Sequence, residues 1–407
     1  MMQDVVIAGG GIGGLACALA LTRAGQRVRV LEQSARLAEV GAGIQLGPNA
    51  VRVLNAWGLS DGLTECVAFP EALKVRDARS SATLGCLQLG ATIRARYGQP
   101  YATIHRADLH SLLLKALRAR ADMDVSLGAR VSSFAEEGDG VSVTCEDGRH
   151  LRGAALVGAD GLWSQVRTQL LGAHPVRASG HLAYRGLALP QDLPAALREP
   201  VVTAWLGDRL HVVHYPVRRG EVFNVVAVVE GVLGQGHGGA AGSDPQSWTH
   251  DAHAADLTRA LGPACSDLMA VIGAVRGWKL WPLNDRPPMA GPGEQARGRV
   301  ALLGDAAHPL RPYLAQGAAM AIEDAWTLGR LRADSRYPVD WSALFARYAQ
   351  ARWSRNARVQ ARSERNGRIF HASGLMRLGR NVAMAMMGES LLDQPWLYGG
   401  PHAPRAE

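Results

Sequence analysis

Short apolar runs that alternate with glycines and an alanine-rich segment open the chain. Asp4 is followed by four apolar residues, 5–8, and then by glycines. Residues 15–21 are rich in alanine and leucine. Gly25 then precedes a second apolar run over residues 27–31. Glycine is common just after the last residue of a helix. The pattern therefore predicts a strand, a helix and a second strand, which together form one βαβ unit.

The later pattern predicts an α/β fold with an insertion. An amphipathic helix is expected near 107–120, and apolar alternation predicts strands over the following segments: 125–131, 141–145 and 151–157. From about 180 to 282, short strands separated by polar turns indicate an antiparallel sheet. A buried strand is expected over 300–303, and helices from 318 to about 379. The predicted fold class is a Rossmann-like dinucleotide-binding domain interrupted by a mostly antiparallel β-sheet substrate domain, with C-terminal helices.

The expected domain boundaries follow from these changes of pattern. The dinucleotide-binding domain is assigned 1–75, 101–179 and 285–340; the substrate domain 76–100 and 180–284; and the C-terminal helical region 341–407.

Composition is typical of a soluble globular protein. The 407 residues are 47% apolar and 20% charged, and no apolar run approaches the ~20 residues of a membrane helix. The N-terminus has no basic segment, so no secretory signal is expected. The five cysteines are scattered without metal-ligand spacing, which favours a reduced, cytoplasmic protein with no metal site. The same scatter argues against a flavin disulfide reductase.

The net charge of +8 is concentrated late in the chain. Arginines recur there mostly every three or four residues, at positions 347, 352, 355, 358, 362, 365 and 368. This spacing predicts a basic stripe along one helix. It is interpreted as a solvated face or a subunit contact in a homodimer, with weak lipid contact as the alternative. No nucleic-acid-binding motif is present, so nucleic acid is not an expected partner.

A glycine pattern at the first strand–helix junction predicts a dinucleotide site. Gly9, Gly11 and Gly14 suit a tight turn that brings backbone close to a pyrophosphate at the helix N-terminus. Glu32 ends the second strand, where its carboxylate can accept ribose hydroxyls. The same glycine pattern recurs over 234–239, but no apolar helix follows it directly. Context therefore selects the first copy.

Several later segments resemble the single-component flavoprotein aromatic hydroxylases, in that family's order along the chain. Gly-Ala-Asp-Gly at 158–161 resembles the DG motif, and Gly-Asp-Ala-Ala-His-Pro at 304–309 resembles the GD motif. Further matching segments are 41–45, 48–49, 105–109 and 315–317. The resemblance is strongest to the 3-hydroxybenzoate 6-hydroxylase, 6-hydroxynicotinate 3-monooxygenase and salicylate hydroxylase branch. It implies that the dinucleotide is FAD and that NADH or NADPH is a transient co-substrate.

The resemblance also implies roles for residues in the cofactor site. Arg106 would neutralise pyrophosphate charge and Asp305 would bind a ribityl or ribose hydroxyl. Gln316 and Gly317 would begin a helix whose amides stabilise reduced flavin, beside Pro309. The remaining implied cofactor contacts are Gly43, Ile44 and Asp160. For Asp160, holding its own loop is an equal alternative.

Strand alternation over 210–216 provides candidate substrate contacts. His211, Val213 and Tyr215 are expected on one face, with His214 on the other. His211 is the candidate base for a phenolic proton, because imidazole titrates near pH ~6.5. Tyr215 would orient the phenolic oxygen; the alternative is that both residues only pack the sheet. Candidate contacts for a substrate carboxylate, or rim residues, are Arg311, Tyr313, Tyr184 and Arg185.

The resemblance therefore implies an enzyme of aromatic catabolism, an NAD(P)H- and O₂-dependent FAD monooxygenase. It would hydroxylate a phenolic acid of the 3-hydroxybenzoate type through a flavin C4a-hydroperoxide. Hydroxynicotinate or salicylate-type acids are alternative substrates. An oxidase or epoxidase on a non-phenolic substrate is a second reading, and a non-catalytic flavin- or lipid-binding protein is a third.

Overall fold

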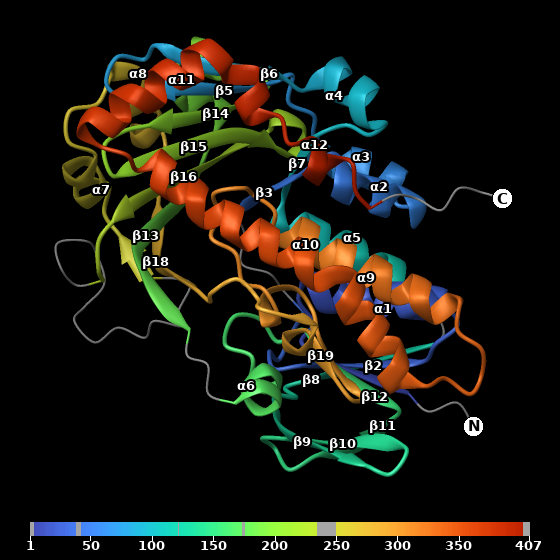
Figure 1. Ribbon diagram of the computed structural model, residues 1–407. Helices are drawn as coiled ribbons and strands as arrows, with labels where there is room; N and C mark the ends of the chain where they lie inside the picture. Colours follow the sequence, from blue (N-terminus) through green and yellow to red (C-terminus); the bar gives the residue numbers. More distant parts are fainter. Residues whose placement is uncertain (1–3, 38–41, 121, 173–175, 234–249, 402–407) are drawn as a thin grey trace. The chain divides into compact units, whose positions relative to one another are not determined.

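The computed structural model describes residues 4–37, 42–120, 122–172, 176–233 and 250–401 (Figure 1). The second glycine pattern, over 234–239, lies outside these ranges. By its internal contacts the chain divides into two compact units, which are described separately. Unit 1 comprises Met1–Val40, Ala107–Arg177 and Asp285–Ser363; unit 2 comprises Gly41–Arg106, Ala178–Asn284 and Glu364–Glu407. Residues 41–75, expected in the dinucleotide-binding domain, thus group by contacts with unit 2, and the functional domain boundaries stay a prediction.

A six-stranded sheet forms the centre of unit 1. Its strand order is β19-β20-β12-β1-β2-β8, and all neighbours are parallel except β19 and β20. The strands are β1 (Val5–Ala8), β2 (Val28–Glu32), β8 (Met123–Leu127), β12 (Ala155–Gly158), β19 (Ala296–Arg297) and β20 (Val300–Leu302). Every residue of β1 and β12 is buried, as expected for parallel strands covered on both faces. The predicted opening βαβ unit and the α/β fold class are confirmed.

Helices and a small sheet complete unit 1. The helices are α1 (Ile12–Arg23), α5 (Arg106–Arg118), α6 (Gln165–Leu171), α9 (Gly317–Ala333) and the first part of α10 (Trp341–Phe370), with short turns η4 (Pro292–Glu294) and η5 (Gly304–Ala306). The small antiparallel sheet contains β9 (Val131–Glu137), β10 (Gly140–Cys145) and β11 (His150–Gly153). α1 and α9 pack side by side (Figure 1). A Cβ on Gly329 would lie 2.8 Å from Cβ of Ala20, so glycine permits this close approach.

An eight-stranded sheet forms the centre of unit 2, in the order β17-β18-β13-β16-β15-β14-β5-β6. Its strands are β5 (Ala72–Asp77), β6 (Thr83–Gln88), β13 (Arg177–Ala188), β14 (Val201–Leu206), β15 (Leu210–Val217), β16 (Val222–Glu230), β17 (His250–Ala252) and β18 (Trp278–Asp285). β14 and β5 are parallel, whereas β13, β16, β15 and β14 form successive antiparallel pairs. A second sheet contains β3 (Gly43–Leu46), β7 (Ala102–His105) and β4 (Val67–Ala68). The predicted mostly antiparallel sheet is thus observed, and its role as a substrate domain stays a prediction.

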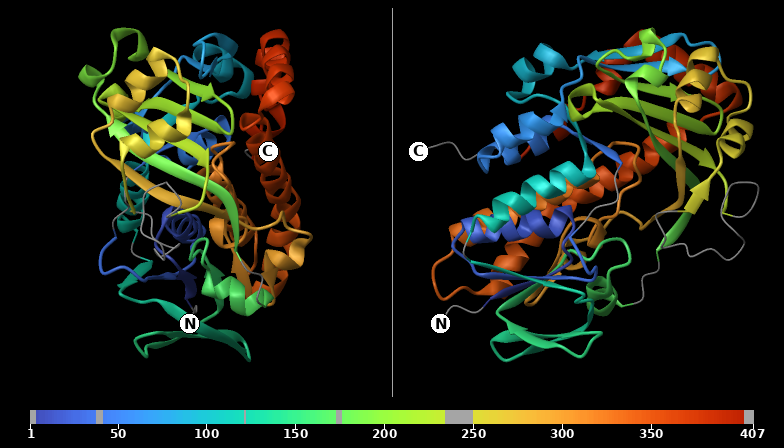
Figure 2. Two further views of the ribbon diagram at one scale, coloured as in Figure 1. Left: turned by 90° about the vertical axis from the view of Figure 1, so that its left-hand side faces the viewer. Right: turned by 180° about the vertical axis from the view of Figure 1, so that it is seen from behind.

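Helices cover both faces of the large sheet of unit 2 (Figure 2). On one face, α7 (Ala254–Leu261) and α8 (Ser266–Gly273) pack against buried residues that include Trp205 and Val212. On the other face, Met384 of α11 (Gly374–Leu392) packs against Leu206. The other helices are α2 (Pro48–Ala56), α3 (Ser60–Cys66), α4 (Gly90–Tyr97) and α12 (Pro395–Tyr398), with turns η1 (Pro190–Asp192), η2 (Ala195–Leu197) and η3 (Arg218–Gly220). No helix in the described ranges is long and apolar enough to cross a membrane.

Candidate active site

The turn between β1 and α1 requires glycine at two positions. Gly9 has φ of +104°, and a Cβ there would lie 2.3 Å from the carbonyl oxygen of Ala159. A Cβ on Gly14 would lie 1.9 Å from the carbonyl oxygen of Gly9. Gly11 is the N-cap of α1 and has no side chain to cap the first amides. The turn therefore leaves backbone N–H groups at the start of α1, where a pyrophosphate binds favourably.

Glu32 is held against this turn at the end of β2. Its Oε2 accepts a hydrogen bond from the backbone N of Gly10 at 2.7 Å, and its Oε1 accepts one from the backbone N of Ser34 at 2.8 Å. Each carboxylate oxygen has a second lone pair with which it can accept a ribose hydroxyl. The position and orientation of Glu32 fit the predicted role in dinucleotide binding.

The GD segment ends at the N-terminus of α9. Gly304 has φ of +60° and begins the turn η5, in which Asp305 is exposed. Pro309 is buried, and Gln316, which is 2% exposed, is the N-cap residue before Gly317. The predicted helix start at Gln316–Gly317 is therefore observed, and its first amides provide positive potential for an anionic group.

A buried ionic network supports the GD segment from behind. His308 Nε2 lies 2.5 Å from Oδ2 of Asp324, and the same oxygen accepts a hydrogen bond from the backbone N of Gly304. Arg352 donates to Asp324 Oδ1 at 2.7 Å and to Glu323 Oε2 at 2.8 Å. Arg355 donates to both oxygens of Glu323. The network joins the GD segment to α9 and α10, and no motif in the sequence indicated it.

The charges of this network are matched although the carboxylates are inaccessible. The side chains of Glu323 and Asp324 are 0% exposed and that of Arg352 is 4% exposed. Burial by itself would raise the pKa of the Asp324 carboxyl, but His308 and Arg352 outweigh it and hold that pKa below its usual value. The interpretation of the basic stripe as a uniformly solvated face or contact surface is therefore wrong for Arg352. Arg347, on the same helix, is exposed as that interpretation required.

Asp160 holds its own loop. Its carboxylate accepts hydrogen bonds from Oγ of Ser164 at 2.5 Å and from the backbone N of Gln165 at 2.8 Å and of Val166 at 3.1 Å, at the start of α6. Burial raises the pKa of Asp160, and these hydrogen bonds oppose the rise. The geometry favours the loop-holding alternative, and direct nucleotide contact by Asp160 stays a prediction.

Arg167 connects the DG and GD segments, a role that the sequence did not reveal. Its guanidinium donates to the carbonyl oxygens of Ala306 at 2.9 Å and Leu162 at 2.6 Å. Burial, followed by repulsion from Arg286, lowers the pKa of Arg167 to about 10, so it stays charged at neutral pH. The two segments are thus fixed to each other by one buried cation.

Arg311 is already neutralised within unit 1. Its Nε donates to Oδ2 of Asp285 at 2.5 Å, and Arg177 also pairs with that carboxylate. Tyr313 is 3% exposed. These observations weaken the proposal that Arg311 binds a substrate carboxylate, because its charge has an internal partner.

In unit 2, β3 and β15 meet in a close contact. The backbone N of Gly43 donates to Oδ1 of Asn224 at 2.6 Å, and a Cβ on Gly43 would lie 2.8 Å from the ring of Tyr215. Ile44 pairs with Ile104 of β7, and the backbone N of Arg106 donates to the carbonyl oxygen of Ala42. Gly43, Ile44 and Arg106 are thus brought together on neighbouring segments, as their predicted shared role requires.

Arg185 is a buried cation close to Tyr215. Its guanidinium carbon lies 3.4 Å from the ring centre of Trp281, and its buried Nε has no hydrogen-bond partner among the described residues. Burial, followed by repulsion from Arg106, lowers the pKa of Arg185 to about 9. Tyr184, suggested with it from the sequence, is instead fully buried in the core and packs edge-on against Trp278. Strand alternation sends the two neighbours to opposite faces.

His211 and Tyr215 lie on the predicted common face of β15. Tyr215 is buried beside Val213 and Val217, whereas His214 stacks on Trp205 on the other face. Burial raises the pKa of Tyr215, with Arg185 and Gln45 opposing it. Four residues of extended strand span about 13 Å. His211 and Tyr215 therefore flank the position above Val213 and do not meet.

His211 has a partner that was not foreseen. Its Nδ1 lies 2.9 Å from Nε2 of His371, which follows α10, and its ring packs edge-on against Phe370. Burial, followed by repulsion from His181, lowers the pKa of His211 to about 3, so its imidazole is neutral at physiological pH. A neutral imidazole has one nitrogen that can accept a proton.

Comparisons with known proteins agree with these features. The model of the FAD binding domain family matches residues 2–363. The 3-hydroxybenzoate 6-hydroxylase 1 of Aquipseudomonas alcaligenes is 39% identical over 406 residues, covering 98% of each chain. A 3-amino-4-hydroxybenzoate 2-monooxygenase of Streptomyces platensis is 37% identical, covering 98% of this chain and 96% of that one. The structure of Klebsiella pneumoniae HpxO complexed with FAD and uric acid superposes with a TM-score of 0.82 at 27% identity, covering 96% of this chain and 95% of that one.

Proposed function

Because this chain belongs to the FAD-binding-domain family of flavoprotein aromatic monooxygenases, we propose that it hydroxylates a phenolic aromatic acid of the 3-hydroxybenzoate type with NAD(P)H and O₂. Family membership confirms the predicted FAD cofactor and the predicted enzyme class. The observation that carries the substrate proposal is the 39% identity to a 3-hydroxybenzoate 6-hydroxylase over 98% of both chains. The histidine and tyrosine on one face of β15 support it.

The residues present fit FAD. The glycine turn at Gly9–Gly14 and the oriented Glu32 would hold the ADP half, and the start of α9 at Gln316–Gly317 would lie at the flavin end. Bound FAD, once reduced by NAD(P)H, supplies the activation of O₂ for ring hydroxylation. The ionic network around Asp324 keeps the GD segment in place for this contact.

His211 is proposed to take the phenolic proton of the substrate. A deprotonated phenol is more electron-rich, and an electron-rich ring carbon is more easily hydroxylated. The imidazole is neutral before substrate binds, and when its Nδ1–H donates to Nε2 of His371 its own Nε2 is able to accept the proton. An anionic substrate nearby would favour the protonated form of His211, which counteracts the effect of burial. Such general-base assistance is typically worth about 10²–10⁴ in rate.

Arg185 is the better candidate than Arg311 to bind the substrate carboxylate. Its Nε has no hydrogen-bond partner among the described residues, whereas Arg311 is paired with Asp285. A guanidinium binds a carboxylate through two parallel hydrogen bonds, which also orients the ring. Tyr215, whose pKa is raised by burial, is neutral and can donate a hydrogen bond to the same acid.

The test is the response of NAD(P)H oxidation to a panel of acids. Tag-free, FAD-loaded protein would be given 3-hydroxybenzoate, 3-amino-4-hydroxybenzoate, 6-hydroxynicotinate, salicylate and a non-phenolic analogue such as benzoate. We expect 3-hydroxybenzoate to give the largest acceleration and a stoichiometric hydroxylated product, identified by mass spectrometry and NMR. If only another acid of the panel gave a hydroxylated product, that acid would replace 3-hydroxybenzoate as the proposed substrate. If no phenol accelerated NAD(P)H oxidation, the result would favour an oxidase or epoxidase that acts on a non-phenolic substrate.

The same proposal includes the assembly and the surroundings of the enzyme. A homodimer, weak lipid contact through exposed arginines such as Arg347 and Arg365, and a cytoplasmic location stay predictions. Sedimentation would measure the dimer. Liposome flotation at low and high salt would measure the lipid contact, since salt screens attraction between arginines and anionic headgroups.

A further inference from the structure

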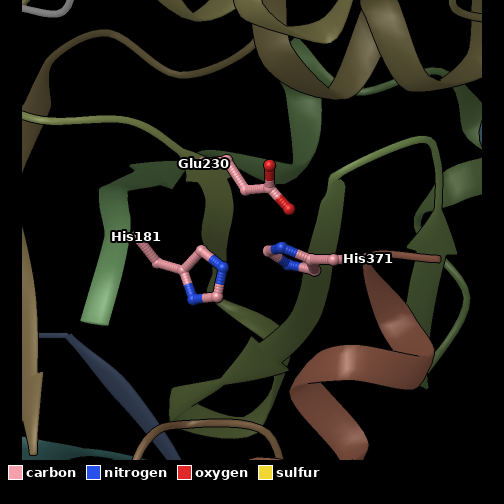
Figure 3. A group of neighbouring side chains, drawn as sticks. All are labelled: His181, Glu230 and His371. Atoms are coloured by element: carbon pink, nitrogen blue, oxygen red, sulfur yellow. The ribbon is translucent and has the colours of Figure 1, made fainter. Parts of the chain in front are cut away.

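A cluster of two histidines and one glutamate lies in unit 2, apart from any sequence motif. Figure 3 shows His181, Glu230 and His371 pointing toward one another from two strands and the segment after α10. One ligand atom from each of the three lies within 4.8 Å of the others. His371 is buried, His181 is half-buried and the Glu230 carboxylate is exposed. We propose that these three side chains bind a divalent transition-metal ion of the zinc class.

The backbone places the three residues together before any ion binds. His181 of β13 and Glu230 of β16 are direct partners in the antiparallel register, which puts their side chains on one face about 5 Å apart at Cβ. Arg209 links the other two: its backbone N donates to the carbonyl oxygen of His371 at 3.3 Å, and its carbonyl oxygen accepts from the backbone N of Glu230 at 3.2 Å. The ligands are therefore fixed by the sheet and by one backbone residue.

The ligand set suits zinc and its neighbours. Imidazole nitrogen and carboxylate oxygen bind Zn²⁺ at about 2.0–2.2 Å, and tetrahedral ligands at that length lie roughly 3.4 Å from one another. The ligand atoms lie within 4.8 Å of one another, so small side-chain rotations can bring them to that distance. Two histidines and one carboxylate leave further positions for water, so Co²⁺, Ni²⁺ and Fe²⁺ are chemically similar occupants.

His371 already has a contact typical of a metal-binding histidine. His371 would bind the ion through Nδ1, and its Nε2–H would then donate to Nδ1 of His211, 2.9 Å away. That donation leaves the proton of neutral His211 on its Nε2, so an occupied metal site and the proposed base role of His211 exclude each other. The competing partner of Glu230 is weak, because Arg209 is 70% exposed and its Nε lies 3.8 Å from the carboxylate. An ion can displace that surface pair at little cost.

Isothermal titration tests the proposal on the FAD-loaded full chain, with any histidine tag removed and metals stripped by chelator. We expect wild-type protein to bind one Zn²⁺ per chain, and Co²⁺ at the same site. His181→Ala and Glu230→Gln should each weaken Zn²⁺ binding at least tenfold, since even partners behind the ligands contribute 10–100-fold. His253→Ala is the matched control: an exposed histidine of the same unit, whose loss should leave the Kd unchanged.

Two further measurements make the result decisive. Equal FAD content and equal melting temperatures of the metal-free variants would show that they are folded, and only wild type and control should then gain melting temperature from Zn²⁺. Anomalous scattering at the zinc edge should give a peak between the three side chains. No binding by wild type, equal binding by all variants, or a peak elsewhere would overturn the proposal. None of these readouts depends on hydroxylation, so the outcome is separate from that of the proposed function.

Discussion

Replacing Arg352 by glutamine tests whether the buried network supports unit 1. Arg352 is 4% exposed at its side chain and bridges Glu323 and Asp324, both 0% exposed. Glutamine keeps a hydrogen-bonding group but removes the cation. The two carboxylates then share less positive charge in a site that water does not reach.

The structure limits the size of this effect. Removing one partner of a buried ion pair typically costs about 3–5 kcal/mol. Here Glu323 retains Arg355, at 2.7 Å, and Asp324 retains His308, so the lower end of about 3 kcal/mol applies. At roughly 2–4 °C per kcal/mol for a unit of this size, the melting temperature should fall by about 6–12 °C.

The pH dependence of the difference provides a second measurement. The pKa of Asp324 is lowered in the folded state, so its contribution to stability is present above the unfolded value of ~3.9 and is lost as pH falls below it. The stability difference between wild type and Arg352→Gln should therefore stay constant from pH 8 to 5 and shrink below about pH 4. Calorimetry or circular dichroism on FAD-loaded protein measures both.

The matched control is Arg347→Gln, which removes an exposed arginine from the same helix. Its effect on stability should be within about 0.5 kcal/mol. Equal melting temperatures for the two variants would refute the assignment of Arg352 to a buried network. The interpretation of the basic stripe as a solvated face would then apply to Arg352 as well.

Of four other predictions, three concern the cofactor and substrate sites and one concerns a buried histidine. Gly14→Ala puts a Cβ 1.9 Å from the carbonyl oxygen of Gly9, so the purified variant should contain little FAD by absorbance at 450 nm; normal flavin content would show that the turn can relax. His211→Ala should lower hydroxylation about 10²–10⁴-fold while stopped-flow flavin reduction survives, and unchanged coupling to product would exclude His211 as the base. Arg185→Met should raise KM for an aromatic acid much more than for its carboxamide; an equal rise for both would remove Arg185 from carboxylate binding. Because burial lowers the pKa of His214 to about 4, the folded protein should lose stability as pH falls from about 6.5 toward 4. His214→Phe should reduce the pH dependence of the denaturant midpoint over that window without abolishing it, because the pKa of His211 is lowered as well.

The sequence by itself determined the features that depend on neighbours in the chain. The opening βαβ unit is local, and the steric demands on Gly9 and Gly14 arise within its first turn. Alternation along β15 separated His211 and Tyr215 from His214, because side chains of a strand change face at every residue. The order of the family motifs indicated FAD and the enzyme class, both confirmed.

Only the tertiary structure decided which charges are already matched. Helical spacing placed Arg352 and Arg347 on one helix, but burial of Arg352 depends on carboxylates that α9 presents to it. Likewise Arg311 was plausible for a substrate carboxylate until Asp285 was found beside it. A charge pattern in sequence says nothing about a partner that comes from another element.

The cluster of two histidines and one glutamate in unit 2 shows the same limit most clearly. The sequence predicted no metal site, because that judgement depended on closely spaced cysteines and histidines. His181, Glu230 and His371 come from β13, β16 and the segment after α10, and they meet through strand register and the backbone of Arg209. Ligands that are brought together by long-range strand pairing form no local sequence motif, so only the folded chain shows that they are neighbours.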